Sequence, residues 1–302
     1  MFKSFEEVER HVLESGAKTR IALCGAHDKA TLSAVIAAKR KGVVEATLVG
    51  DERLIVEALR SLGVDEADYE IAHAASDGMA SAKAMELVRD GQADIEMKGG
   101  LPSADFLLPI MNPFDGLVEL GDVLSETTVF RYEGQDRFMF ATDCALSIAP
   151  DLGDKAKLIE NAVELAKAFG FEGVNVAALS ALERVNPQIP STQDADELSK
   201  MEWPEGVCVA GPFALDNALD GEAARHKGID DPVAGCADIL LMPDLCTGNI
   251  FHKCIHYFGH MDSAAVVCGT KKPIVFTSRS DSPETKYNSI LSAILQSMSL
   301  RS

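Results

Sequence analysis

The fold class is decided by TRIALCGA (19–26), DKATLSAVIAAKRKG (28–42), VEATLVGD (44–51) and ERLIVEALRSLG (52–63). Short apolar runs alternate here with longer segments in which apolar residues recur at helical spacing. That alternation is typical of parallel βαβ units, whose helices cross back over the sheet. We therefore predict an α/β fold in which helices cover both faces of a mostly parallel sheet.

The rest of the chain continues the pattern with one interruption, at residues 129–143. There VFRYEGQDRFMFATD contains two extended runs around a turn-forming EGQD, which predicts a hairpin or another antiparallel excursion from the parallel sheet. Strand-like and helix-like segments then alternate up to the helical run 284–300, which Ser282 and Pro283 should begin as N-cap and first residue. At 302 residues, a doubly wound chain commonly splits in two. We predict a first lobe made of 1–130 and 272–302 and a second lobe of 131–271, with ligand bound between them.

The charge balance excludes several classes of partner. There are 47 acidic and 28 basic residues, so the chain carries a net charge of −19. General attraction to nucleic acid or to an anionic membrane is therefore not expected. No apolar run reaches transmembrane length, and the N-terminus lacks the apolar core of a signal peptide. We expect a cytoplasmic protein that binds any anionic substrate in a local basic pocket.

The seven cysteines are odd in number and contain no CxxC pair. Reduced thiols in a cytosolic protein fit this pattern best. Cys254 with His252, His256 and His260 could be imagined as a zinc site, because steps of four place side chains on one helical face. No second ligand cluster is evident, so we expect no metal and interpret these histidines as a helix surface near a cleft or solvent.

Four polar clusters follow apolar runs: MKGGLPS (97–103), FATDCALSIAPD (140–151), MPDLCTGNIFHK (242–253) and FTSRSDSPET (276–285). Strand ends that lead into helices present free backbone N–H groups, which suit phosphate. Each cluster alone is explained equally well by turn and cap residues. Neither GxGxxG nor GxxxxGK[ST] occurs. The sequence therefore lacks the phosphate-binding loops of nicotinamide-dependent dehydrogenases and of P-loop nucleotide-binding proteins.

Together with LCGAHDKATL, STQDADEL, GPFALDNAL and EAARHKGI, these clusters resemble the phosphate acetyl/butyryltransferase family, with the butyryl branch closer. The similar segments extend over nearly the whole chain. The resemblance implies a two-lobed, three-layer α/β/α fold like that of isocitrate and isopropylmalate dehydrogenases, with an interlobe cleft. It also implies a homodimer or higher homo-oligomer, and coenzyme A thioester, inorganic phosphate and acyl phosphate as substrates, with no tightly bound cofactor.

The resemblance also assigns roles to residues. Arg279 matches the position that holds phosphate, and a planar guanidinium suits bidentate pairing with that anion. Ser278 matches a serine that hydrogen-bonds the reacting centre and helps stabilise charge on the carbonyl oxygen. Further substrate contacts are implied for a set of polar side chains in the quoted motifs: Lys98, Ser103, Asp216, Asn249 and Lys253. Each of these has an alternative role as a helix cap or a structural contact.

Some positions depart from the family pattern. Pro102 stands where a histidine is common, and a Ser-His pair appears as Ser125-Glu126. Thr285 occupies the position of the acetyl branch's aspartate, which leaves the general base open between Glu284 and Asp281. Cys144 matches the acetyl branch, which blurs the acyl preference. As an acyl-carrying nucleophile, Cys144 is a minor alternative, because no adjacent histidine completes an activating pair in the sequence.

We therefore expect a direct transfer in a ternary complex, in which the thiolate of coenzyme A attacks the acyl phosphate while Arg279 holds the phosphoryl group. Two rivals remain from the sequence. One is an acyl carrier protein:phosphate acyltransferase, which the acidic surface disfavours because carrier proteins are themselves acidic. The other is a catalytically silent acyl-CoA-binding paralogue.

Overall fold

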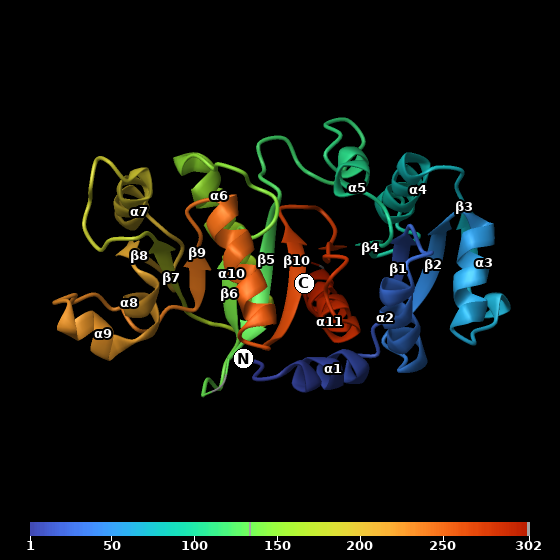
Figure 1. Cartoon of the computed structure of the whole chain (residues 1–302), viewed down its shortest axis with the longest axis horizontal. Helices are drawn as coiled ribbons and strands as arrows, with labels where there is room; N and C mark the ends of the chain where they lie inside the picture. Colours follow the sequence, from blue (N-terminus) through green and yellow to red (C-terminus); the bar gives the residue numbers. More distant parts are fainter. Residues whose placement is uncertain (133, 301–302) are drawn as a thin grey trace. The chain divides into compact units, whose positions relative to one another are not determined.

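The computed structural model describes residues 1–132 and 134–300, which form two compact α/β units. Unit 1 comprises residues 1–3 and 123–263, and unit 2 comprises residues 4–122 and 264–302. The elements are labelled in Figure 1. Each unit has a layered α/β/α architecture, which confirms the predicted fold class. The lobe boundaries expected from the sequence stay a prediction.

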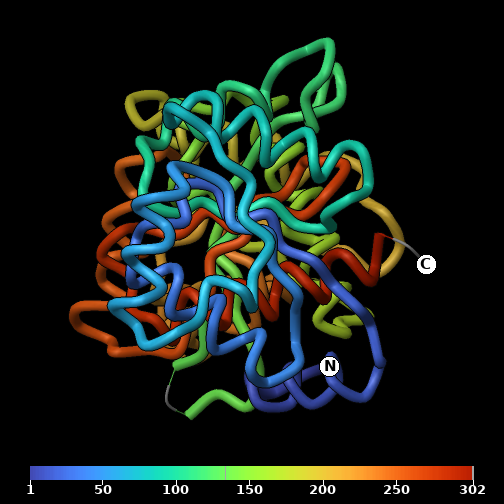
Figure 2. The backbone as a smooth tube through the Cα atoms, turned by 90° about the vertical axis from the view of Figure 1, so that its right-hand side faces the viewer, coloured from blue at the N-terminus to red at the C-terminus, as the bar shows by residue number. Residues whose placement is uncertain are grey.

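In unit 2 the strand order is β3-β2-β1-β4-β11-β10, and Figure 2 traces this unit from the side of β3 and α3. β1, β2, β3, β4 and β11 run parallel, as the alternation predicted. The strands are β1 (Thr19–Cys24), β2 (Val44–Gly50), β3 (Glu70–His73), β4 (Ile95–Lys98), β10 (Asp262–Cys268) and β11 (Ile274–Val275).

The helices of unit 2 lie on both sides of its sheet (Figure 1). α4 packs on α5, and α11 packs on α1 and α2. Buried Val8 and Val12 of α1 and a long buried face of α11 supply apolar side chains for this packing. The helices are α1 (Phe5–Glu14), α2 (Lys29–Arg40), α3 (Glu52–Ser61), α4 (Asp77–Arg89), α5 (Ser103–Ile110) and α11 (Pro283–Ser299), with a 3₁₀ turn at Glu66–Asp68.

In unit 1 the strand order is β5-β6-β9-β7-β8. β5 and β6 are antiparallel, which confirms the predicted hairpin, and β6, β9, β7 and β8 are parallel. The strands are β5 (Ser125–Arg131), β6 (Met139–Thr142), β7 (Val174–Leu179), β8 (Val207–Phe213) and β9 (Ile239–Leu241). The helices are α6 (Leu152–Ala168), α7 (Pro190–Lys200), α8 (Leu215–Leu219), α9 (Gly221–His226) and α10 (Leu245–Tyr257).

One pairing departs from simple βαβ alternation. β10 and β11 are antiparallel, with Val267 opposite Ile274. Only residues 269–273 connect them, which is too short for the crossover that a parallel pair needs. β11 is short and ends at Val275. Residues 276–282 therefore lie outside the strand, and they contain the Ser278–Arg279 turn.

Candidate functional site

The ends of β1, β4 and β11 meet at one edge of the unit 2 sheet. Cys24 is in register with Lys98, and Val275 with Met97. Gly99 is required there, because a Cβ on it would lie 2.5 Å from the Gly25 carbonyl oxygen. The Lys-Gly-Gly stretch therefore packs directly on the loop after β1. In open α/β sheets, ligands bind at such carboxyl ends of strands.

Lys98, the last residue of β4, carries a buried amine. Its residue exposure is 4%, and Nζ lies 5.8 Å from the centre of the Phe276 ring. Nζ also donates a hydrogen bond to the Gly99 carbonyl oxygen at 3.4 Å. Burial lowers the pKa of Lys98, and the neighbouring charges of Arg279 and Lys286 lower it further. The charges of Arg279 and Lys286 thus disfavour the charged form of Lys98, and a bound anion would relieve this repulsion.

The Ser278–Arg279 turn is fixed by hydrogen bonds to its backbone. The Ser278 N–H donates to Asp281 Oδ2 at 2.7 Å, and the Asp281 N–H donates to the Ser278 carbonyl at 3.1 Å. Lys286 Nζ donates to the same carbonyl at 2.5 Å. The Arg279 side chain is exposed, and Ser278 Oγ lies 3.0 Å from Ser280 Oγ. The structure therefore brings together Lys98, Ser278, Arg279 and Asp281 from the sequence prediction.

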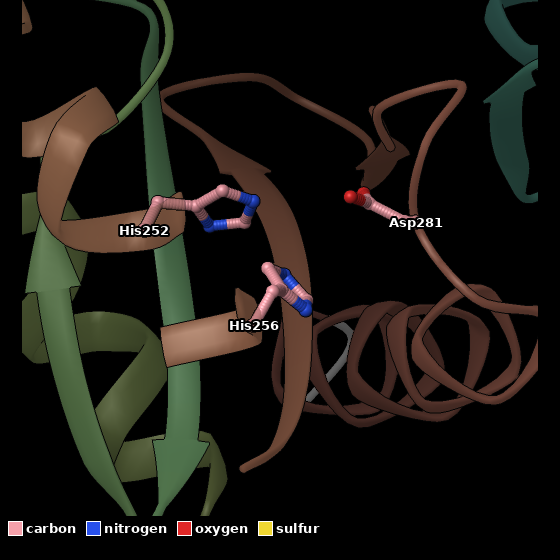
Figure 3. Close-up of side chains that lie close together, drawn as sticks. All are labelled: His252, His256 and Asp281. Atoms are coloured by element: carbon pink, nitrogen blue, oxygen red, sulfur yellow. The ribbon is translucent and has the colours of Figure 1, made fainter. Parts of the chain in front are cut away.

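The two candidate bases have different surroundings. Asp281 is buried on the loop before α11 (Figure 3), whereas Glu284 is exposed in the first turn of that helix. Ser282 caps the helix by accepting from the Thr285 N–H at 3.0 Å, as predicted. Thr285 is buried, and its hydroxyl lies 3.1 Å from Ser282 Oγ. Thr285 therefore takes part in the helix cap.

Ser103 lies at the first position of α5, after a Pro102 that forms no side-chain cap. Its side chain is exposed. Phe106, one turn later, is fully buried, and its ring centre lies 6.0 Å from that of Phe276. This contact joins the start of α5 to the segment that leads to the Ser278 turn. The role of Ser103 in substrate binding stays a prediction.

In unit 1, Asn249 and Lys253 lie one turn apart on α10. Asp244 caps this helix by accepting from the Thr247 N–H at 2.8 Å. Gly248 allows the helix to approach the end of β6, because a Cβ there would lie 2.0 Å from the Asp143 carbonyl oxygen. Asn249 Nδ2 then donates to the Cys144 carbonyl at 3.4 Å. Close packing of α10 on the end of β6 thus explains the glycine of the Gly-Asn motif.

A buried polar cluster in unit 1 was not found by sequence reasoning. Thr128 Oγ1 donates to Glu126 Oε1 at 3.1 Å and lies 2.9 Å from His252 Nδ1. The Asp143 carboxylate accepts from the N–H groups of Glu126, Ala145 and Leu146 at 2.7 to 2.8 Å. Burial raises the pKa of Asp143, and these backbone donors oppose the rise. The polar Ser-Glu-Thr-Thr run that opens β5 was the available signal.

Cys144 is fully buried beside this cluster. Burial raises the pKa of its thiol well above the ordinary value, and the nearby Glu126 and Asp143 raise it further. A thiol held in its protonated form is a poor nucleophile. The surroundings of Cys144 therefore disfavour the alternative in which it carries the acyl group.

The histidine row on α10 is shorter than the sequence suggested. His252 and His256 lie one turn apart with ring centres 4.6 Å from one another (Figure 3). The helix ends at Tyr257, however, and His260 follows it with a positive φ of 47°. The expectation that His260 shares a helical face with the other two is therefore wrong.

Asp216 lies in α8 within a surface ion network of unit 1. Lys227 Nζ lies 2.8 Å from an Asp216 carboxylate oxygen and 2.5 Å from Glu183 Oε1. The hydrogen bond from Lys227 lowers the pKa of Asp216. Such exposed pairs contribute little stability. Substrate binding by Asp216 stays a prediction, as it does for Asn249 and Lys253.

Comparison with known proteins gives the same family as the motifs. The family model described as "Phosphate acetyl/butaryl transferase" matches residues 66–294. The chain is 43% identical to the phosphate butyryltransferase of Clostridium acetobutylicum over 98% of both chains. It is 36% identical to the phosphate acetyltransferase of Thermotoga maritima over 92% of this chain and 96% of that one.

A solved structure agrees in fold. A branched-chain phosphotransacylase from Enterococcus faecalis superposes with a TM-score of 0.82 at 29% identity, covering 92% of this chain and 99% of that one. The matched residues 66–294 include the Lys-Gly-Gly stretch, α10 and the Ser278–Arg279 turn. This chain therefore belongs to the phosphate acetyl/butyryl transferase family.

Proposed function

We propose that this chain is a phosphate acyltransferase that moves a short acyl group reversibly between coenzyme A and inorganic phosphate. The observation that carries the proposal is the group of cations at the strand ends of unit 2. Lys98 and Lys286 are buried and Arg279 is exposed beside them, in a chain whose net charge is −19. Such a chain has no general affinity for anions, so this local group supports a specific anion site.

In the direction that forms acyl-CoA, the sulfur of coenzyme A attacks the carbonyl carbon of the acyl phosphate. A carbon–sulfur bond forms, the carbon–oxygen bond to the phosphoryl group breaks, and phosphate leaves with the bonding electron pair. Arg279 holds the phosphoryl group through a bidentate contact. The Ser278 hydroxyl donates to the carbonyl oxygen as negative charge develops there. The proton released by the thiol goes to a base, and no protein nucleophile is needed.

Glu284 is our candidate for that base. Its carboxyl is exposed on the first turn of α11, five residues after Arg279, so solvent and substrate can reach it. Asp281 has one carboxylate oxygen engaged by the Ser278 N–H. A thiol of pKa about 8.5 is mostly protonated at neutral pH, so even a modest base raises the rate.

Several finer assignments belong to the same proposal. Substrate contacts are proposed for Lys98, Ser103, Asp216, Asn249 and Lys253. A preference for butyryl over acetyl groups follows the higher identity to the butyryltransferase of C. acetobutylicum than to the acetyltransferase of T. maritima. A cytoplasmic location and a homo-oligomer are proposed as well. In the described part of the chain, no helix is long and apolar enough to cross a membrane.

The test is release of free thiol from butyryl-CoA by the purified chain, with and without inorganic phosphate. We expect thiol release that depends on phosphate, together with one equivalent of acyl phosphate trapped by hydroxylamine. Thiol release that is independent of phosphate would contradict the proposal. Binding of butyryl-CoA without any turnover would favour the catalytically silent paralogue, and turnover only with acyl carrier protein thioesters would favour the other rival.

A further inference from the structure

Lys286 is a buried cation that sequence reasoning left without a role. It lies on the first turns of α11 with 1% of its surface exposed. Its Nζ donates to the Ser278 carbonyl at 2.5 Å and to Thr277 Oγ1 at 3.4 Å. Lysine is almost never buried so completely without partners, because an ammonium group loses its hydration. The burial of this amine therefore indicates that its contacts with Ser278 and Thr277 have a specific role.

Asp281 also forms hydrogen bonds with the backbone of Ser278. Its Oδ2 accepts from the Ser278 N–H at 2.7 Å, and its own N–H donates to the Ser278 carbonyl at 3.1 Å. The Ser278 carbonyl thus accepts from two donors, Lys286 Nζ and the Asp281 N–H. A carbonyl oxygen has two lone pairs, so both are used. The N–H and the carbonyl of Ser278 are fixed by groups of opposite charge.

We propose that Asp281 and Lys286 are positioning residues that fix the backbone of Ser278, so that Arg279 and the Ser278 hydroxyl are aimed at the phosphoryl and acyl groups. This inference rests on the proposed acyl transfer. Arg279 is long and exposed, and its direction depends on the backbone that carries it. A displacement of about 1 Å in such a group is enough to cost a large part of its effect. The carboxylate of Asp281 then serves the turn, and proton removal is left to another group.

The first experiment separates positioning from direct binding. Lys286→Met, Arg279→Ala and the double variant are compared for KM and kcat with phosphate and butyryl-CoA. We expect Lys286→Met alone to raise the KM for phosphate about tenfold while the KM for butyryl-CoA changes less than about twofold. In the Arg279→Ala background, the same substitution should add less than about twofold, because there is no longer an arginine to position.

Equal losses in both backgrounds would overturn the proposal, since Lys286 would then act on phosphate without Arg279. Lys155→Met is the matched control, because Lys155 is 5% exposed and pairs with Asp194 at 2.6 Å in unit 1. Lys286→Gln retains a donor but not the charge. Partial recovery in Lys286→Gln relative to Lys286→Met supports a hydrogen bond to the turn, and equal loss in the two variants contradicts it.

Substitutions of Asp281 separate positioning from general-base catalysis. The amide oxygen of Asp281→Asn can still accept from the Ser278 N–H, whereas Asp281→Ala cannot. We expect Asp281→Ala to lose more activity than Asp281→Asn, and Asp281→Asn to keep the pH profile of the wild type. If Asp281→Asn loses activity near neutral pH and recovers it at higher pH, Asp281 is the base and the proposal is wrong.

Hydrogen exchange tests the same contacts without any need for turnover. We expect peptides over residues 274–282 to exchange faster in Lys286→Met and Asp281→Ala than in Lys155→Met. If the wild type lacks phosphate-dependent transfer but exchange responds in this way, the proposed function is wrong. The hydrogen bonds from Asp281 and Lys286 to the Ser278 backbone would still be supported. Unchanged exchange in both variants would overturn the positioning role itself. Should Lys286→Met fail to fold, Lys286→Gln and Asp281→Ala carry the comparison.

Discussion

The two buried lysines of unit 2 near the ends of β4 and β11 differ from the buried Asp143 of unit 1, at the end of β6, in charge and in hydrogen-bond partners. Unit 2 buries the amines of Lys98 and Lys286, which donate to backbone carbonyl oxygens. Unit 1 buries the carboxylate of Asp143, which accepts from backbone N–H groups. In unit 1, backbone N–H groups satisfy the charge of Asp143, whereas in unit 2 the charges of Arg279 and Lys286 disfavour the charged form of Lys98, which favours an added anion.

The largest expected effect concerns stability in unit 1. Asp143→Ala removes the acceptor of three backbone N–H groups at once. The Glu126 N–H is buried and those of Ala145 and Leu146 are partly buried. A buried unsatisfied donor costs about 1 to 3 kcal/mol, so we expect the free energy of unfolding to fall by about 3 kcal/mol. Urea denaturation measures it. Asp216→Ala, at an exposed ion pair, is the control and should change stability by less than about 1 kcal/mol. Similar losses in both variants would show that the backbone hydrogen bonds of Asp143 contribute no more stability than an exposed ion pair.

In unit 2 the largest expected effect is on catalysis. Arg279→Ala should lower kcat/KM for phosphate by at least about tenfold, because a charge-assisted bidentate contact is worth about 1.5 to 3 kcal/mol. The melting temperature should stay close to that of the wild type, since the side chain is exposed. Arg53→Ala, at an exposed arginine on α3, serves as the control. Unchanged phosphate kinetics in a folded Arg279→Ala variant would show that Arg279 does not hold phosphate, and that the cations of unit 2 form no anion site.

Glu96 gives a pH-dependent test of unit 2. Its two carboxyl oxygens are buried and find no hydrogen-bond partner within residues 1–132 and 134–300. Burial raises the pKa of Glu96 well above its ordinary value. Above about pH 4.3 the unfolded chain has therefore lost a proton that the folded protein still holds. The stability that this residue contributes is complete below that pH and is lost as the pH rises, by about 1.4 kcal/mol per unit up to the folded pKa.

Glu96→Gln should remove that slope, because the amide does not titrate in this range. We expect the melting temperatures of the variant and the wild type to be close near pH 4 and to diverge in favour of the variant toward pH 8. Thermal unfolding across this range measures the difference. A constant difference at all pH values would mean that Glu96 is already ionised in the folded state. The contrast with the N–H-bound carboxylate of unit 1 would then be lost.

The smallest expected effect concerns the base. Glu284→Gln should lower turnover about fivefold, or about 1 kcal/mol, when acyl phosphate and coenzyme A are the substrates. The KM for phosphate should change little, and higher pH should restore part of the rate as free thiolate increases. Steady-state kinetics from pH 6 to 9 measure this. Wild-type rates at every pH would place the base in another segment or in solvent.

Much of the architecture was predictable because it depends on local patterns. The alternation of apolar runs and helical segments predicted the parallel strands of unit 2, and the turn-forming EGQD predicted the β5–β6 hairpin. Ser282 and Pro283 predicted the start of α11, since cap chemistry depends on neighbouring residues alone. The antiparallel pairing of β10 with β11 was not predicted, because strand direction depends on where the chain returns to the sheet.

The sequence by itself determined the α/β class, the family and the motif residues, including the Ser278–Arg279 pair. Periodicity, caps and motif spacing are local and survive in one dimension. Only the tertiary structure decided which polar side chains share a site. Lys286 lies eight residues beyond Ser278 yet donates to its carbonyl, and Thr128 contacts His252 from far along the chain. Burial and hydrogen-bond partners set the charge and basicity of such groups, and both are properties of the packed chain.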